Sequence, residues 1–399
     1  MTEYTLTNRQ ARRFLLLRHG LFGAYRFIGA EGALQFIRQC GSIQYDPVDL
    51  CGKNAELTLQ SRVKNFKKEM LTDLLYHSRA LFDYPDKCLS IIPVEDWPYF
   101  GRYRKAARLR GTEPQISVLC EQTLQYIAKN GAVDSDSLPL DGDVRWKSAI
   151  HWSNSTKAAR AALEQLYSTG ELIIHHRSGS RKSYDLAGNH LPQALLSAAD
   201  PLPDDADHLA WRVLRRIGAV GLLPNTASDA WLNIDGLKAA QRNVCFERLL
   251  NEKRIIRVKV DGFHAPLYCL SEDEPLLLEA TSDTAFSPRC EFLAPLDCFL
   301  WDRKLIRALF GFDYTWEVYT PPEKRKFGAY VLPILWGERL IGRIEPVADR
   351  KNGVLKIKNV WLEPDFVPSA AFKKAFRTAL TRLAHFNDCK TADGIPSDL

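Results

Sequence analysis

The feature that most constrains the fold of this 399-residue chain is an order of elements that recurs along it: helix, helix, β-hairpin. It is clearest over 155–186, where an Ala- and Leu-rich helical segment ends at Gly170 and two strand-like runs flank a basic, glycine-containing turn. Glycine is the usual residue after the last turn of a helix, and strand-like runs joined by such a turn predict a hairpin. With the helix expected over 116–129 in front of it, this stretch predicts a winged helix.

The same order is expected on both sides of this stretch. Before it, helices are predicted over 5–18, capped by Thr7, and over 31–39, and an extended piece over 79–84. After it, helices over 208–217 and 234–252 precede strands over 254–260 and 265–270 that turn at Asp261-Gly262, a strong hairpin signal. The stretches 191–207 and 271–290 are predicted to be linkers.

The last hundred residues have a different pattern. Short strands are predicted over 314–319, where apolar and polar side chains alternate, and over 330–335, 340–344 and 354–362, before a helix over 372–384. We therefore predict an α+β fold in four parts. Winged-helix units occupy 1–110, 111–190 and 200–270, and a small β-sheet with a terminal helix occupies 290–386.

The composition excludes several classes of protein. No run of about 18 apolar residues is present, so no membrane span is predicted, and the N-terminus does not resemble a secretion signal. A cytoplasmic location is therefore expected. The nine cysteines include no Cys-x-x-Cys pair, and His175 and His176 lack a further ligand at helical spacing. We predict neither a disulfide framework nor a metal or cofactor site.

Basic residues outnumber acidic ones, 54 to 48, and the excess lies towards the two ends of the chain. Residues 1–110 hold 18 basic and 11 acidic side chains, and residues 291–399 hold 17 and 14. A protein that closes its ends on a polyanion has this distribution, although a mixed solvated surface is also compatible with it.

Two groups of basic side chains are candidate DNA contacts. The first belongs to the helix and hairpin of 155–186 and consists of Lys157, Arg177, Arg181 and Lys182. A winged helix approaches a duplex with these two elements, but the same fold also serves as a building block. The second group is Arg303 and the run Lys324, Arg325 and Lys326; the alternatives there are a structural ion pair with Asp302 and a solvated turn.

The tetrapeptide Gln44-Tyr45-Asp46-Pro47 is a candidate functional element. The residue before a proline is driven towards extended conformations, so Gln44 and Asp46 are expected to point to the same side of the backbone. The alternative is structural: Asp46 caps a helix that begins near Pro47, a favoured first helical residue.

Longer motifs resemble the AlkZ/YcaQ-like (AlkX-type) winged-helix DNA glycosylases. They are Leu-Ala-Pro-Leu-Asp (293–297), Trp-Asp-Arg (301–303), Phe-Gly-Phe-Asp-Tyr (310–314), Lys-Arg-Lys-Phe-Gly-Ala-Tyr-Val-Leu-Pro (324–333) and Ala-Asp-Arg-Lys (348–351). Trp152-Ser153 is similar to that family's middle unit, and Gln44-Tyr45-Asp46 to the Gln-apolar-Asp catalytic element of its YcaQ branch. The chain departs from the family's pattern at 53–56, at 85–87 and at Glu345.

The resemblance implies tandem winged helices in a C-shaped arrangement. It implies hydrolysis of the N-glycosidic bond of alkylated purines, of the N7-alkylguanine or N3-alkyladenine type and including interstrand crosslinks, by Gln44 and Asp46. It also implies that Lys324, Arg325 and Lys326 lie near the DNA-facing surface. The expected partner is double-stranded DNA with alkylated bases, bound by a monomer.

The chemistry of the lesion is consistent with this expectation. A guanine alkylated on its ring nitrogen is cationic and leaves as a neutral base, so one carboxylate is enough, whereas ordinary glycosidases need a second carboxyl group to protonate the leaving group. Asp46 would orient or deprotonate the attacking water and Gln44 would position it. We predict a metal-independent, monofunctional enzyme.

Two other classes remain open at this stage. One is a non-catalytic winged-helix DNA-binding protein or transcriptional regulator, for which a dimer and palindromic half-sites are expected. The other is a scaffold for protein partners, for which no salt-dependent DNA affinity is expected.

Overall fold

The computed structural model describes residues 3–110, 114–146, 156–282, 286–397 and 399. The chain forms two compact units, each assembled from separate stretches of sequence. Unit 1 comprises residues 1–71, 84–92 and 206–399, and unit 2 comprises residues 72–83 and 93–205. Unit 1 therefore combines the first and the last parts of the sequence. The finer, four-part division stays a prediction. No helix of the described residues has the length and apolarity to cross a bilayer.

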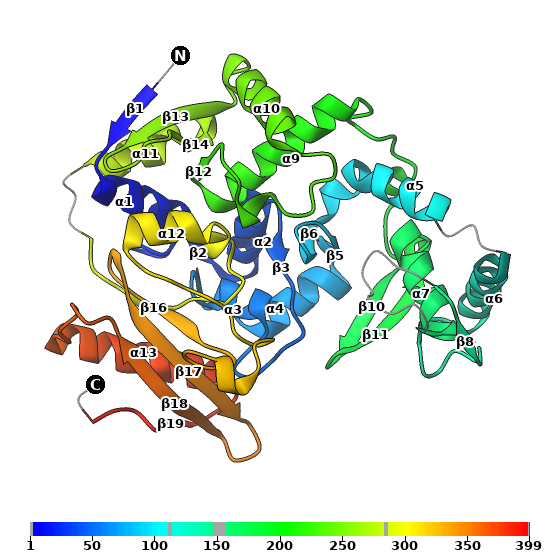
Figure 1. Cartoon of the computed structure of the whole chain (residues 1–399). Helices are drawn as coiled ribbons and strands as arrows, with labels where there is room; N and C mark the ends of the chain where they lie inside the picture. The colour runs from blue at the N-terminus through cyan, green and yellow to red at the C-terminus, as the bar shows by residue number, and fades with distance from the viewer. Residues whose placement is uncertain (1–2, 111–113, 147–155, 283–285, 398) are drawn as a thin grey trace. The chain divides into compact units, whose positions relative to one another are not determined.

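The C-terminal part of unit 1 is a five-stranded sheet covered by a helix (Figure 1). Its strands, in spatial order, are β15 (Cys290–Phe292), β16 (Leu332–Trp336), β17 (Arg339–Asp349), β18 (Val354–Leu362) and β19 (Thr391–Asp393). The first four pair antiparallel, and β19 runs parallel to β18. Helix α13 (Ala370–Phe386) buries Phe372, Phe376 and Leu380 in the same core as Phe292 and Ile344. The predicted small sheet with a terminal helix is confirmed.

A second sheet of unit 1 contains the strands of the segment 200–270. Its order is β1 (Glu3–Leu6), β13 (Ile255–Val260), β14 (Leu267–Leu270) and β12 (Leu223–Pro224). Helices α9 (Asp205–Val220) and α10 (Ala239–Asn251) precede the β13–β14 hairpin, as predicted. The turn between the strands contains Gly262 at φ 84°, a conformation that favours glycine. Strand β1, which pairs parallel to β13, was not predicted.

The N-terminal segment adds short elements to unit 1. Helix α1 (Asn8–Arg18) begins after Thr7, whose side chain accepts a hydrogen bond from the Gln10 amide, as predicted. The remaining elements are β2 (Phe27–Ile28), α2 (Gly29–Cys40), β3 (Ile43–Gln44), α3 (Asn54–Gln60), β4 (Val63–Lys64), α4 (Lys68–Thr72) and β6 (Leu89–Pro93). Helix α4 ends at the boundary with unit 2, and β5 (Leu81–Pro85) crosses the boundary. Strand β2 pairs with β4 and β3 with β6.

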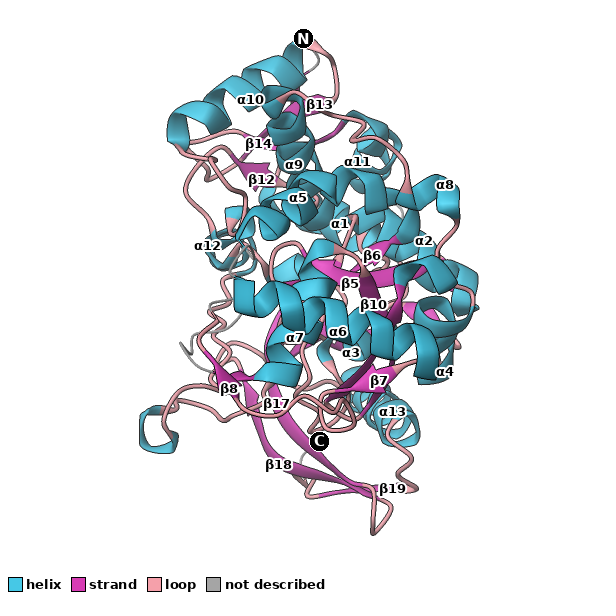
Figure 2. Cartoon of the chain, turned by 90° about the vertical axis from the view of Figure 1, so that its right-hand side faces the viewer, coloured by secondary structure: helices cyan, strands magenta, loops and turns pink. Residues whose placement is uncertain are grey.

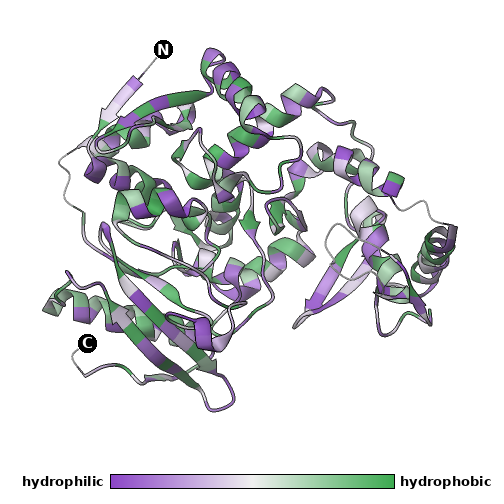
Figure 3. Ribbon diagram, in the orientation of Figure 1, coloured by the Kyte–Doolittle hydropathy of each residue, from purple (hydrophilic) through white to green (hydrophobic). Residues whose placement is uncertain are grey.

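Unit 2 contains the predicted helix-helix-hairpin order. Helices α6 (Pro114–Asn130) and α7 (Ala158–Thr169) pack together and against the strands (Figure 2), and Gly170 ends α7 at φ 84°. Strands β10 (Leu172–Ser178) and β11 (Arg181–Leu186) form the hairpin, whose tip is hydrophilic (Figure 3), and β7 (Val133–Asp134) pairs with β11. The unit also contains α5 (Gly101–Arg110), α8 (Gln193–Leu196), β8 (Asp143–Val144), β9 (Thr156–Lys157) and short turns of helix over 73–77, 94–100 and 187–189. Trp152, Ser153 and Ser155 lie outside the described residues. The naming of these repeats as winged helices stays a prediction.

Predictions from the sequence are wrong for 271–290 and 314–319, and the expected linker 191–207 contains the short helix α8. The expected linker 271–290 contains helix α11 (Glu274–Thr281), which buries Leu277 and Ala280. One of the acidic residues, Asp273, is not solvated but forms a buried ion pair with Arg18 at 2.6 Å. The expected strand 314–319 is a loop between α12 (Arg303–Phe310) and β16. The alternation of apolar and polar side chains in this segment has another cause. Tyr314 is buried outside the sheets, where its hydroxyl donates a hydrogen bond of 2.7 Å to the Val331 carbonyl.

Candidate active site

The backbone of the Gln44-Tyr45-Asp46 element is held in an extended conformation by β6. Gln44 lies opposite Ser90 in an antiparallel pair, and the Tyr45 amide donates to the Leu89 carbonyl at 2.9 Å. Because side chains alternate along an extended segment, this pairing supports the expectation that Gln44 and Asp46 face the same side, which stays a prediction. Asp46 follows directly after the last of these hydrogen bonds.

Gln44 is a buried amide with an unused acceptor. Its side chain belongs to a residue that is only 7% exposed, and its Oε1 has no hydrogen-bond partner among the described residues. The backbone carbonyl of Gln44 accepts a hydrogen bond of 2.8 Å from Asn54 Nδ2. A buried acceptor without a partner is uncommon and costs free energy, so it indicates a position for a water molecule or a ligand group.

Asp46 is half-buried and does not cap a helix. Its Oδ1 accepts a hydrogen bond of 2.9 Å from the Val48 amide, and no helix begins at Pro47, since α3 begins at Asn54. The structural alternative raised from the sequence is therefore wrong. Burial raises the pKa of the Asp46 carboxyl group, and the hydrogen bond from Val48 opposes that rise only in part. A carboxylate that is more basic than usual accepts a proton from water more readily.

The C-terminal part of unit 1 holds the segment that follows Asp46 through three consecutive carbonyls. Leu50 O accepts from the Ala348 amide of β17 at 2.7 Å, and Cys51 O from Asn387 Nδ2 at 2.7 Å. Gly52 O accepts from the Tyr330 hydroxyl at 3.2 Å. The catalytic candidate from the N-terminal segment is thus positioned by residues some 300 positions later in the chain.

Three aromatic rings follow one another next to Asp46, from the core of unit 1 to its surface. Tyr330 is buried, Trp316 is half-buried and Tyr319 is 78% exposed. The Trp316 ring lies edge-on to both neighbours, with centroid distances of 6.3 Å to Tyr330 and 5.5 Å to Tyr319. Burial is the main cause of the raised pKa of both tyrosines, and the negative charge of Asp46 adds to the rise, for Tyr330 after that of Cys51. We call Trp316, Tyr319 and Tyr330 the aromatic row.

The predicted basic contacts 324–326 belong to the same loop as the aromatic row. The Glu317 carboxylate accepts hydrogen bonds from the backbone amides of Lys326, Phe327 and Gly328 at 2.8, 2.9 and 3.2 Å and so folds the loop on itself. The side chains of Lys324 and Lys326 are exposed. Arg325 is directed inward, because its Nε donates to the Thr320 carbonyl at 2.8 Å.

Arg303 begins helix α12 and is half-buried. Its guanidinium lies 5.8 Å from the centroid of the Tyr314 ring. Asp302, the alternative partner considered from the sequence, instead caps α12 by accepting from the Leu305 amide at 2.9 Å.

In unit 2, three of the four predicted DNA contacts are engaged in ion pairs. Arg177, whose side chain is 5% exposed, pairs with Asp83 at 2.9 Å, and Lys182 pairs with Glu164 at 2.7 Å. Arg181 is half-exposed and reaches Asp136 at 3.1 Å and Asp134 at 3.6 Å. Lys157, at the start of α7, is exposed. These ion pairs favour the building-block interpretation for Arg177 and Lys182, while the DNA contacts themselves stay a prediction.

The positions where the chain departs from the family's pattern are structural supports that the sequence did not reveal. Asn54 joins the Gln44 carbonyl to the Leu296 amide, which donates to Asn54 Oδ1 at 2.8 Å. Asp86, completely buried, pairs with three arginines of α9 and accepts from the Ser42 hydroxyl at 2.7 Å. The nearby guanidinium groups lower the pKa of Asp86 despite its burial.

Glu345 has a similar role in the loop of the aromatic row. Its Oε1 accepts from the Ala329 amide at 3.2 Å, and a Cβ on Gly328 would lie 2.5 Å from its carboxyl carbon. A side chain at position 328 would therefore displace the Glu345 carboxylate. One of these supports had a signal in the sequence, since the three arginines of α9 that pair with Asp86 are close together and indicate a buried carboxylate. Asn54 and the aromatic row had no such signal, because their partners are distant in the sequence.

Comparisons with known proteins identify the family of this chain. A model of the family described as DNA glycosylase AlkZ-like matches residues 37–386, which include Gln44, Asp46, the aromatic row and the basic loop. The structure is similar to that of the Streptomyces sahachiroi DNA glycosylase AlkZ, with a TM-score of 0.62 and 18% sequence identity, over 97% of this chain and 98% of that one. The family match spans well over half of the chain, and the chain therefore belongs to the AlkZ-like DNA glycosylases.

Proposed function

We propose that this DNA glycosylase hydrolyses the N-glycosidic bond of alkylated purines in double-stranded DNA, as a monomer, with Asp46 and Gln44 acting on the attacking water. The substrate class is the N7-alkylguanine or N3-alkyladenine type. One observation carries the proposal. A half-buried carboxylate with a raised pKa lies two positions from a buried amide oxygen that has no partner within the described part of the chain.

The reaction requires one carboxylate. The water oxygen bonds to C1′ of the sugar as the bond from C1′ to the base nitrogen breaks, and the electron pair of that bond neutralises the cationic base. Asp46 takes the proton released by the water and stabilises the positive charge that develops on the sugar. Gln44 Oε1 accepts a hydrogen bond from the same water. The Val48 amide fixes the plane of the Asp46 carboxylate during this step.

The proposal extends to interstrand crosslinks. A crosslinked base is covalently joined to the opposite strand, so it cannot be rotated into a deep pocket in the way that a flipped base is. Tyr319 offers a different form of recognition, because it is 78% exposed at the end of the aromatic row. A base can stack on such a ring at the surface.

We also propose that Lys324, Lys326 and Arg303 in unit 1, together with Lys157 in unit 2, contact DNA phosphates. The two lysines of the basic loop are exposed and share their loop with Tyr319. Phosphate contacts of this kind position a protein on the duplex without reading its sequence, as a repair enzyme requires.

The test is single-turnover release of the base from a duplex that carries one N7-methylguanine, and in parallel from a duplex with one nitrogen-mustard crosslink. We expect release by the wild type and a fall in rate of at least ~100-fold, about 2.7 kcal/mol of barrier, in Asp46→Asn. Gln44→Ala is expected to fall by about 10-fold, since it removes one hydrogen bond to the water.

The matched control is Asp49→Asn. Asp49 lies three residues from Asp46, but its carboxylate is engaged by Arg350 at 2.6 Å and by the Gly52 amide at 2.9 Å. This variant should retain the wild-type rate. No release of either base, together with tight and salt-dependent binding to the duplex, would refute the proposal and favour the non-catalytic DNA-binding protein.

A further inference from the structure

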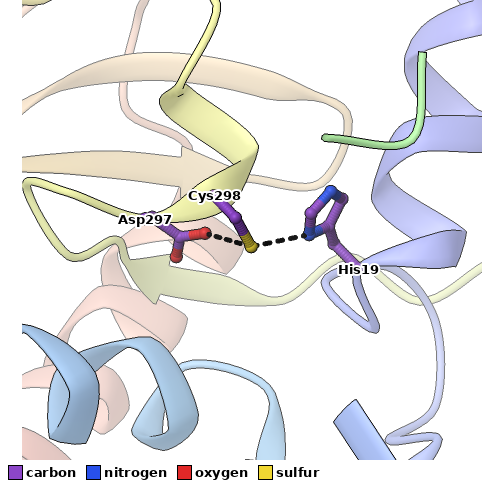
Figure 4. Close-up of side chains that lie close together, drawn as sticks. All are labelled: His19, Asp297 and Cys298. Atoms are coloured by element: carbon purple, nitrogen blue, oxygen red, sulfur yellow. Dashed lines mark hydrogen bonds between the residues drawn. The ribbon is translucent and has the colours of Figure 1, made fainter. Parts of the chain in front are cut away.

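Two clusters of metal-binding side chains occur among the described residues, one in each unit. The cluster in unit 1 consists of His19, Asp297 and Cys298 (Figure 4), and all three are completely buried. Its donor atoms are already engaged. His19 Nε2 donates to the Val220 carbonyl at 2.9 Å, and the guanidinium of Arg62 contacts both His19 Nδ1 and Asp297. Arg62 therefore supplies the positive charge that an ion would bring, and this cluster is part of the core.

The cluster in unit 2 is different. His175, Asp185 and His190 each offer one ligand atom, and these atoms lie within 4.8 Å of one another. His190 Nε2 is 2.7 Å from Asp185 Oδ2, and the rings of His175 and His190 have a centroid distance of 5.2 Å. His175 and His190 are half-buried, so the cluster is open to solvent on one side.

A β-bulge lies at the first histidine of the cluster. Strand β10 shifts its register against β11 between Ile174 and His176, so that His175 is the extra residue. In a regular strand, neighbours point to opposite faces, but a bulge changes the direction of one side chain. The Nδ1 atoms of His175 and His176 are consequently only 2.8 Å apart. His175, which the spacing in the sequence did not connect to any further ligand, thus lies with Asp185 and His190, and His176 contacts only the His175 ring of this group.

Hydrogen bonds from neighbouring residues fix the orientation of the Asp185 carboxylate. Asp185 Oδ1 accepts hydrogen bonds from the Leu186 amide at 2.8 Å and from Asn189 Nδ2 at 3.3 Å, which leaves Oδ2 directed at His190. Such second-layer hydrogen bonds are typical of metal-binding carboxylates. One positive charge opposes an ion here: Arg79 is bound to the backbone carbonyls of Leu75, Ile174 and His175. The negative charge of Asp185 offsets it.

We propose that His175, Asp185 and His190 form a binding site for one divalent transition-metal ion, with water as the remaining ligand. Imidazole ligands favour Zn²⁺, Ni²⁺ and Co²⁺ over Mg²⁺ and Ca²⁺, which prefer oxygen. Two histidines with one carboxylate and an open position match the composition of known zinc sites. Bound there, the ion joins the base of the β10–β11 hairpin to the turn 187–189. The site belongs to unit 2, and Asp46 to unit 1.

The experiment uses the full chain without a histidine tag, stripped with a chelator and titrated with ZnCl₂ by calorimetry. We expect one Zn²⁺ per chain in the wild type and a loss of affinity of at least ~10-fold in His190→Gln. The control is His77→Gln, also in unit 2. His77 forms a pair with Asp73 at 2.7 Å that resembles the His190–Asp185 pair but has no second histidine. This variant should bind Zn²⁺ like the wild type.

Co²⁺ provides an independent measurement. Its visible spectrum should show ligand-field bands without the near-ultraviolet band of a thiolate ligand, and His175→Gln should abolish them even if His190→Gln does not fold. Absence of stoichiometric binding, binding that both variants retain, or a thiolate band would each overturn the proposal. Base release is not part of these readouts, so their outcome is independent of the glycosylase activity.

Discussion

Replacement of Asn54 by alanine tests whether the position of Gln44 matters for catalysis. Asn54 is 1% exposed and makes two hydrogen bonds of 2.8 Å to backbone groups, as donor to the Gln44 carbonyl and as acceptor from the Leu296 amide. Each buried group left without its partner costs about 1–3 kcal/mol, so the free energy of unfolding of unit 1 should fall by about 2–6 kcal/mol.

The rate should fall as well. Without Asn54, the Gln44 backbone loses its link to 294–297, and an error of about 1 Å in the position of a reacting group can cost up to ~100-fold in rate. We expect single-turnover release of N7-methylguanine to slow by about 10- to 100-fold at a temperature where the variant is folded. Denaturant titration followed by tryptophan fluorescence measures the stability of the same preparations.

The control for this prediction is Thr58→Val, one turn further along α3. It removes a buried hydrogen bond of 2.9 Å to the Asn54 carbonyl and preserves the shape of the side chain. We expect a loss of about 1 kcal/mol and an unchanged rate. A rate for Asn54→Ala within twofold of the wild type, or an equal loss of rate in both variants, would refute the positioning argument.

Three further predictions concern the same unit and the hairpin. Burial raises the pKa of Asp46 above the usual aspartate value of 3.8, and the ionised form is the active one. The single-turnover rate should therefore fall as the pH decreases through this raised pKa. The rate of Asp46→Asn should not show this fall at acidic pH. Tyr319→Ala should weaken binding to lesion-containing DNA by about 1–3 kcal/mol in a fluorescence-anisotropy titration, whereas Val367→Ala, which alters another exposed apolar residue, should have no effect. Lys326→Gln should reduce the slope of log affinity against log salt concentration by about 1. Arg177→Gln breaks an ion pair whose two side chains are almost completely buried. This variant should lower the melting temperature and leave the salt slope unchanged.

Elements with local causes were predictable from the sequence. The cap at Thr7, the end of α7 at Gly170 and the turn at Gly262 depend on residues within a few positions of each other, and the structure contains all three. The extended Gln44-Tyr45-Asp46 segment was predictable for the same reason, because Pro47 restricts its neighbour locally.

Features that depend on distant partners were not predictable. The 314–319 alternation predicts a strand, but Glu317 binds three backbone amides about ten residues later and makes a loop. Strand β1 pairs with β13 some 250 positions away. Acidic residues near 271–290 indicated a linker because their buried partner, Arg18, lies in α1.

The same distinction holds for the candidate site. The residue types and the spacing of Gln44 and Asp46 indicated which chemistry to expect, because an amide and a carboxylate two positions apart in an extended segment face one target. Only the tertiary structure decided their properties. Burial raises the pKa of Asp46 and leaves Gln44 Oε1 without a partner in the described part of the chain. This burial is produced by packing between segments far apart in the sequence. The His175–Asp185–His190 cluster likewise arises from a bulge and a turn, whose effect on side-chain direction is not visible in the sequence.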